Sequence, residues 1–196
     1  FKLADAEYVF AAQGSVVRDA EAVAQYLRDT RGLKVGVLNL TMFPPFPSDL
    51  VAALLAGKQG GVVLERTDQP LAVELPMIRE IRSALAQAAE NGRAVAARSA
   101  GKRRLRRKEA PPAGPLPYSK LPAIETDRVP DLYSACYGLG GRDLQPADLV
   151  AAIENMADGF GRRQFYLVLS PALEPKLRDQ SGRLRNNLPC PTKKDD

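Results

Sequence analysis

Short apolar runs alternate along this chain with segments whose apolar residues recur at every third or fourth position. The runs lie at 8–12, 34–41, 62–66, 133–139 and 164–169. Runs of this length predict buried strands, and the spacing between them predicts amphipathic helices. Because successive strand–helix units require parallel strands, the pattern predicts an α/β domain, a three-layer sandwich with a mostly parallel sheet.

Each predicted helix has one apolar face, which we expect to point inward. The faces are Val16, Val17, Ala20, Val23, Ala24 and Leu27; Leu50, Val51, Leu54 and Leu55; Leu75, Ile78, Ile81 and Leu85; and Leu149, Val150 and Ile153. Ser15 and Ser48 stand where N-caps are expected, and Gly32 stands where the first helix should end.

The regular pattern stops near residue 88 and returns near residue 122. Residues 89–121 are basic and then proline-rich, which predicts a flexible insertion in a domain formed by 1–88 and 122–160. Residues 161–188 read either as the last strand and helix of this domain or as the start of the next one. Residues 189–196 are predicted to form a disordered tail.

Composition excludes several kinds of site. The chain has no histidine, so serine–histidine triads and histidine-ligated zinc are excluded. Its two cysteines, Cys136 and Cys190, are too few for a four-thiolate cluster and suit a reducing, cytoplasmic setting. Cys136 falls in a predicted buried strand and reads as an inert thiol. There is no apolar run long enough for a membrane span.

The first residue is Phe1 rather than methionine, and a strand is predicted within a few residues of it. We therefore expect the chain to be a piece of a longer polypeptide.

Positive charge is concentrated in one segment. The net charge is +5, and seven cations lie between Arg98 and Lys108, so the remainder carries 5 − 7 = −2. A run of this kind can contact phosphates, but it lacks interleaved aromatic residues, so nucleic acid is disfavoured as a partner. One hypothesis for the chain is a stand-alone binding module or regulator whose basic loop contacts an acidic partner.

Polar and glycine residues follow several predicted strands, at the edge of an open α/β sheet where ligands usually bind. Glu65, Arg66 and Asp68 follow the third strand and could act as acids, bases or contact residues. The turn that begins at Gly138 has Asp143 where a dinucleotide-binding loop needs its third glycine, so it reads as a structural turn. Phe43 and Phe46 lie in a rigid Phe-Pro-Pro-Phe-Pro segment. We expect this segment to form a ridge that docks against another domain.

Five segments stand in a characteristic order. They are Tyr8-Val-Phe-Ala-Ala-Gln-Gly-Ser, Lys34-Val-Gly-Val-Leu-Asn-Leu, Phe43-Pro-Pro-Phe-Pro, Val62-Val-Leu-Glu-Arg-Thr-Asp-Gln-Pro and Tyr137-Gly-Leu-Gly-Gly-Arg-Asp. Together they resemble the second domain of pyruvate:ferredoxin oxidoreductase and related 2-oxoacid:acceptor oxidoreductases, which is similar to the C-terminal domain of transketolase.

The resemblance implies an oligomeric enzyme that uses thiamine diphosphate and Mg²⁺ to decarboxylate a 2-oxoacid oxidatively to an acyl-CoA. It also implies [4Fe-4S] clusters that pass electrons to ferredoxin or flavodoxin. This chain matches none of the family's cofactor ligands, so we expect it to bind no cofactor or metal alone and to have no catalytic residue.

What the resemblance gives this domain is a packing role against other domains or subunits. The candidate interface residues are Phe43, Phe46, Glu65, Arg66, Asp68, Gly140, Gly141, Arg142 and Asp143. Pro44 stands where the family usually has an arginine, so no contact of that arginine is carried over.

Overall fold

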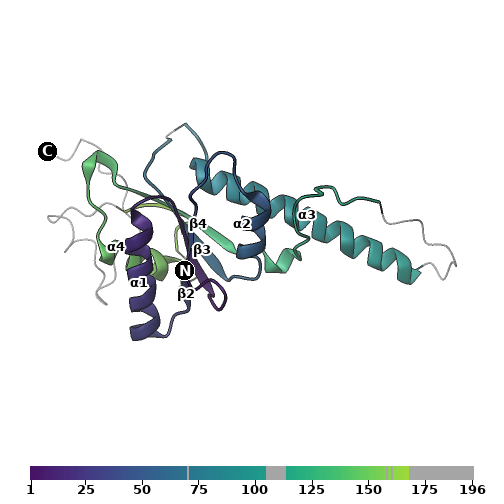
Figure 1. Ribbon diagram of the computed structural model, residues 1–196, viewed down its shortest axis with the longest axis horizontal. Helices are drawn as coiled ribbons and strands as arrows, with labels where there is room; N and C mark the ends of the chain where they lie inside the picture. The colour runs from purple at the N-terminus through teal and green to yellow at the C-terminus, as the bar shows by residue number, and fades with distance from the viewer. Residues whose placement is uncertain (70, 105–113, 158, 160, 168–196) are drawn as a thin grey trace.

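The computed structural model describes residues 1–69, 71–104, 114–157, 159 and 161–167. Five strands form one parallel sheet in the order β2-β1-β3-β4-β5. The strands are β1 (Tyr8–Ala12), β2 (Val35–Asn39), β3 (Gly60–Glu65), β4 (Asp131–Tyr137) and β5 (Gln164–Leu167). The predicted three-layer α/β fold with a parallel sheet is confirmed (Figure 1).

Helices cover both faces of this sheet. They are α1 (Val16–Arg31), α2 (Ser48–Leu55), α3 (Pro76–Arg104) and α4 (Pro146–Ala157), with short 3-10 turns η1 (Thr126–Arg128) and η2 (Leu139–Gly141). Because successive strand residues point to opposite faces, Val9 and Ala11 pack with α2 and α3, whereas Phe10 and Ala12 pack with α1 and α4. Two apolar cores therefore enclose the sheet.

Most of the predicted inward faces are buried. All six predicted residues of α1 are buried, as are the four assigned to the segment that begins at Leu75. Leu50 is the exception, because it is 56% exposed in the first turn of the short helix α2, whose buried side is formed by Val51, Ala52 and Leu55. Leu54 and Val150 are only partly buried.

Two of the three predicted cap positions are confirmed. Ser15 is the N-cap residue of α1, although its backbone is helical and its side chain makes no capping bond. The N-cap prediction for Ser48 is wrong, because Ser48 is itself the first residue of α2 and Pro47 precedes it. Gly32 ends α1 with a left-handed φ of 67°, and its N–H donates to the Leu27 carbonyl.

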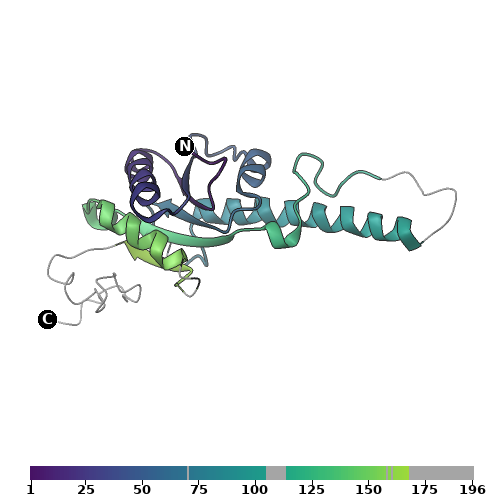
Figure 2. The same cartoon turned by 90° about the horizontal axis from the view of Figure 1, so that it is seen from below.

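The flexible insertion predicted at 89–121 is wrong for its first part. Residues 89–104 continue α3, which runs for 29 residues. Alanine and arginine dominate this stretch and favour helix, so propensity sustains the helix after the apolar period ends. The helix extends beyond the sheet in both views (Figures 1 and 2).

The segment that returns from α3 is tied to the helix by Asn91, which is fully buried. Its Nδ2 donates to the Tyr118 and Leu121 carbonyls at 2.8 and 3.0 Å, and its Oδ1 accepts from the Tyr118 N–H at 3.0 Å. The backbones of α3 and of the returning segment are in direct contact at Gly92. A Cβ built on Gly92 would lie 1.9 Å from the backbone oxygen of Ile124. The predicted insertion therefore returns along a fixed path where it is described.

The segment that could have begun a new domain joins this sheet. β5 pairs in parallel with β4, with Ser134 opposite Gln164 and Tyr137 opposite Leu167. The helix and tail predicted after β5 lie outside the described residues, as do residues 105–113. No helix in the described part of the chain is long and apolar enough to cross a membrane.

Candidate functional site

The predicted site residues lie on loops that follow β2, β3 and β4, at the carboxyl edge of the sheet. Arg66, Gly140, Gly141 and Asp143 are exposed, and Phe43, Phe46, Asp68 and Arg142 are partly buried. Parallel strands bring their carboxyl ends to one edge, so a shared edge is a direct consequence of the topology. Their role as interface residues stays a prediction.

The aromatic ridge after β2 is anchored at one end. The Phe43 and Phe46 rings meet edge to face, with centroids 6.0 Å apart and an interplanar angle of 86°. Phe46 also packs against the core between the sheet and α2 and α3. Met42, just before the ridge, is 50% exposed. The ridge thus presents apolar surface on a fixed base.

Glu65, the last residue of β3, faces inward instead of lining the contact edge. It is 7% exposed, and its carboxylate accepts from the backbone N–H groups of Met77 and Ile78 at 2.7 and 3.1 Å. Those donors belong to the first turn of α3 and have no partner within the helix. Burial raises the pKa of Glu65, although the two N–H bonds oppose that rise. Glu65 therefore caps α3 from a neighbouring strand.

The loop after β3 is tied to the next two strands. The Tyr166 hydroxyl donates to Asp68 Oδ1 at 3.1 Å, and the Cys136 thiol donates to the Thr67 carbonyl at 3.0 Å. Burial, with the nearby carboxylates of Asp68 and Glu65, raises the pKa of Cys136 to about 11. The thiol is therefore protonated at neutral pH and is a poor nucleophile.

Arg66 lies against the glycine turn that follows β4. Gly138 has a left-handed φ of 69°, and a Cβ built there would lie 2.9 Å from the Arg66 Nε. A side chain at 138 would therefore displace Arg66 and strain the turn. This contact joins two of the motifs that the sequence singled out.

Exposed apolar side chains mark the same edge, and the sequence reasoning missed them. Leu71 is fully exposed and Val73 is 91% exposed, both in the loop between β3 and α3. Met42, which is 50% exposed in the loop after β2, is a third exposed apolar side chain at this edge. The sequence does offer a signal, because Leu71 and Val73 are branched apolar residues within a loop. It was overlooked because the segment that follows has the apolar period of a helix.

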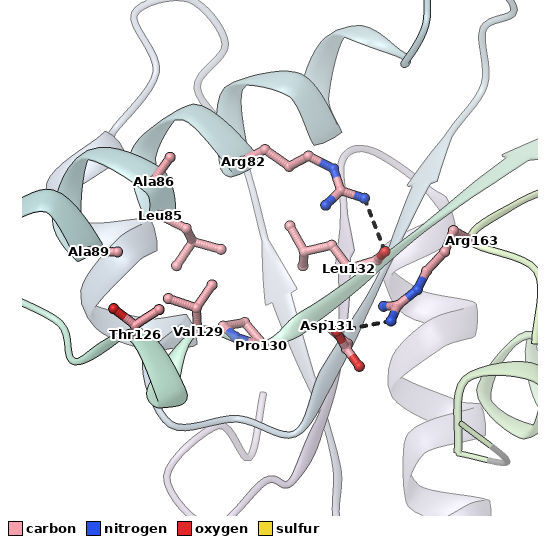
Figure 3. A pocket seen from close by; sticks show the side chains of 10 residues that line it. All are labelled: Arg82, Leu85, Ala86, Ala89, Thr126, Val129, Pro130, Asp131, Leu132 and Arg163. Carbon is pink, nitrogen blue, oxygen red and sulfur yellow. Dashed lines mark hydrogen bonds and ion pairs between the residues drawn. The ribbon is translucent and has the colours of Figure 1, made fainter. Parts of the chain in front are cut away.

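A groove of about 650 Å³ lies at the opposite end, beside the start of β4 (Figure 3). Its apolar wall includes Leu85, Val129 and Leu132. The charges at its rim are paired: Arg82 Nε lies 2.5 Å from Glu74 Oε1, and Arg163 Nη2 lies 3.0 Å from Asp131 Oδ1. This groove offers apolar packing surface and paired charges, which suits structural contact better than acid–base chemistry.

Two of the candidate carboxylates already have partners in the fold, and the described residues include no cluster of metal-ligating side chains. Among the described residues no group of three or more histidine, cysteine, aspartate or glutamate side chains could hold a metal ion. Glu65 and Asp68 are engaged by the fold itself, as described above.

The chain is similar to known proteins over most of its length. The family model "pyruvate:ferredoxin oxidoreductase core domain II" matches residues 6–108. The pyruvate synthase subunit PorA of Thermotoga maritima is 31% identical over 159 residues, which are 81% of this chain and 30% of that protein. The pyruvate-flavodoxin oxidoreductase of Nostoc is 27% identical over 162 residues, which are 82% of this chain and 11% of that protein.

A third relative, named "probable pyruvate-flavodoxin oxidoreductase", is from Escherichia coli and is 39% identical over 88 residues, 44% of this chain and 7% of that protein. The chain thus spans less than a third of each of these relatives. The family model covers more than half of the chain, and the motif order agrees with it. The chain therefore belongs to the pyruvate:ferredoxin oxidoreductase family, in which it corresponds to core domain II.

Proposed function

We propose that this chain is a non-catalytic packing domain of a pyruvate oxidoreductase. The whole enzyme uses thiamine diphosphate and Mg²⁺ to decarboxylate pyruvate, forms acetyl-CoA, and passes electrons through [4Fe-4S] clusters to ferredoxin or flavodoxin. Those cofactors lie in other domains or subunits of the oligomer. The relatives, which are named for pyruvate and flavodoxin, support this assignment.

The observation that carries the packing role is the presence of exposed apolar side chains on two loops of the carboxyl edge. Met42, Leu71 and Val73 are 50%, 104% and 91% exposed, on loops that the fold holds by Phe46 and Asp68. A group of exposed apolar side chains on fixed loops is typical of a surface that another protein covers. Arg66 and Arg142, on loops of the same edge, supply polar groups for such an interface.

The proposal is tested by changing this surface in the native enzyme. Leu71→Glu with Val73→Glu puts two charges into the interface, so we expect loss of assembly and at least a tenfold fall in pyruvate-dependent reduction of a viologen dye. Gel filtration and the dye assay measure the two effects.

Tyr26→Glu, at a 50% exposed position on α1, is the matched control and should leave assembly unchanged. Unchanged assembly and activity in the Leu71/Val73 variant would contradict the packing role. A wild-type protein that holds no thiamine diphosphate or iron, and reduces no dye with pyruvate, would contradict the enzyme assignment.

A further inference from the structure

The loop between β3 and α3 carries the two most exposed large apolar side chains in the part of the chain that the structure describes. It projects at the end of the sheet where α3 begins (Figure 1), and its described residues are 66–69 and 71–75. Leu71 is 104% exposed and Val73 is 91% exposed, whereas Leu75 is 2% exposed. The chain therefore returns to the core directly after the exposed pair.

The first end of the loop is bonded to the two strands that lie beyond β3 in the sheet. The thiol of Cys136 in β4 donates to the Thr67 carbonyl at 3.0 Å. The hydroxyl of Tyr166 in β5 donates to Asp68 Oδ1 at 3.1 Å. Because Asp68 and Tyr166 are 98 residues apart in the sequence, only the sheet brings them together. Two consecutive loop residues are thus bonded to two different strands.

The second end of the loop is bonded to α3. Glu74 Oε1 lies 2.5 Å from Arg82 Nε, and the Glu65 carboxylate accepts from two N–H groups in the first turn of this helix. Within the loop, the Ala72 N–H donates to the Gln69 carbonyl at 2.9 Å and closes a turn. The exposed side chains therefore lie on a short span whose two ends are both held.

The bond between Asp68 and Tyr166 can be separated from the core beneath it. Glu65 and Cys136 are buried, so a change at either residue disturbs the core, whereas Asp68 and Tyr166 are only partly buried. The Tyr166 ring packs against the core between the sheet and the helices α2 and α3, and its hydroxyl reaches the loop. A phenylalanine would keep the ring and lose only the hydroxyl.

A loop that is fixed before it docks has less freedom to lose. Association costs conformational entropy for every side chain and loop that it orders. Leu71 and Val73 lie on the same span, so a movement of its bonded end would displace both of them. The bonds at the ends of the loop therefore favour docking of the two side chains together, in one arrangement.

We propose that Asp68 and Tyr166 are positioning residues of the carboxyl edge, which hold Leu71 and Val73 where these side chains pack against a neighbouring domain. The inference rests on the proposed packing function. It adds a role for β5, which contributes to the interface through this bond. Leu71 and Val73 make the contact, and the bonded pair acts through them.

The test is a double-mutant cycle in the native enzyme. Tyr166→Phe removes the hydroxyl, and Leu71→Ala with Val73→Ala removes the packing side chains without adding charge. Tyr118→Phe is the matched control, because its hydroxyl also donates to a carboxylate, that of Glu90 at 3.2 Å, in the segment that returns beside α3.

Sedimentation gives the dissociation constant of the assembled enzyme, and hydrogen exchange reports on residues 67–75. We expect Tyr166→Phe to raise the dissociation constant about fivefold, the scale of one hydrogen bond, and to speed exchange in the loop. Added to the alanine pair at 71 and 73, it should change the constant by less than about twofold, since the side chains that it positions are gone. Tyr118→Phe should leave both measurements unchanged.

Asp68→Ala removes the same bond from the loop side and gives an independent measurement. It should match Tyr166→Phe in the dissociation constant and in the exchange of the loop. Because both changes remove one bond, the combined variant should be no weaker in assembly than the weaker of the two single variants.

Two outcomes would overturn the positioning role alone. One is normal assembly of both Tyr166→Phe and Asp68→Ala while the alanine pair at 71 and 73 weakens assembly. The other is an equal effect of Tyr166→Phe with and without the alanine pair, which would show that Tyr166 acts apart from those side chains. If the alanine pair leaves assembly unchanged, the packing function itself is contradicted, and the positioning role with it.

Discussion

Glu65 shows how one residue can have a role that its sequence position conceals. It ends a strand at the edge where ligands usually bind, which led to its prediction as a contact residue. In the fold its carboxylate turns inward and caps the first turn of α3, with bonds of 2.7 and 3.1 Å to two backbone N–H groups. The loop between them hides this relationship, because 11 residues separate Glu65 from Met77.

The raised pKa of Glu65 predicts a pH dependence of stability. Burial raises the pKa above its ordinary value of 4.5, so the folded protein holds the proton more tightly than the unfolded chain. The contribution of Glu65 to the free energy of unfolding should therefore fall as pH rises from 4.5 through the raised pKa, and stay level above it. Urea unfolding of wild type and Glu65→Gln at several pH values measures the difference.

Glu65→Gln removes the ionisable group and keeps one acceptor oxygen, so the wild type should lose stability relative to this variant as pH rises through that window. Glu125→Gln, on an exposed loop, controls for loss of a negative charge. A difference between wild type and Glu65→Gln that grows in favour of wild type across the window would contradict the raised pKa.

At the scale of elements, α3 combines a packed half and a projecting half. Leu75, Ile78, Ile81 and Leu85 have the period of a packed helix, and their burial follows from it. Beyond Asn91 the helix depends on alanine and arginine propensity and on the segment that returns beside it. Short helices are marginal in water, so this support matters to the part of α3 beyond residue 91.

Asn91→Ala should loosen the segment at 115–124 that returns beside α3. It removes two donors and one acceptor that bind the backbone at Tyr118 and Leu121, and it leaves those groups without their partner. We expect a loss of about 1–3 kcal/mol in the free energy of unfolding and faster hydrogen exchange at 115–124. Exchange mass spectrometry measures the second effect directly.

Gln87→Ala on the same helix is the control, because its side chain donates to Ser83 Oγ on the same helix. It should leave exchange at 115–124 unchanged. Equal protection in wild type and Asn91→Ala would show that the returning segment is held by other contacts.

At the scale of the whole molecule, α3 connects the carboxyl edge of the sheet with the opposite end of the molecule. It begins under the Glu65 cap and runs for 29 residues, which is about 43 Å. The exposed apolar side chains at the carboxyl edge suit packing against another domain, which is the role proposed for this edge.

The sequence alone determined the strands, the inward faces of α1 and α3, the parallel sheet and the family. These follow from apolar periods and from local motif order, which folding does not alter. Tertiary structure decided the rest. The Glu65 cap, the Arg66 contact at Gly138 and the exposure of Leu50, Leu71 and Val73 depend on which segments meet in space. How far α3 extends depends on its contacts with a distant segment, which Asn91 binds through its side chain. No local sequence pattern encodes these contacts.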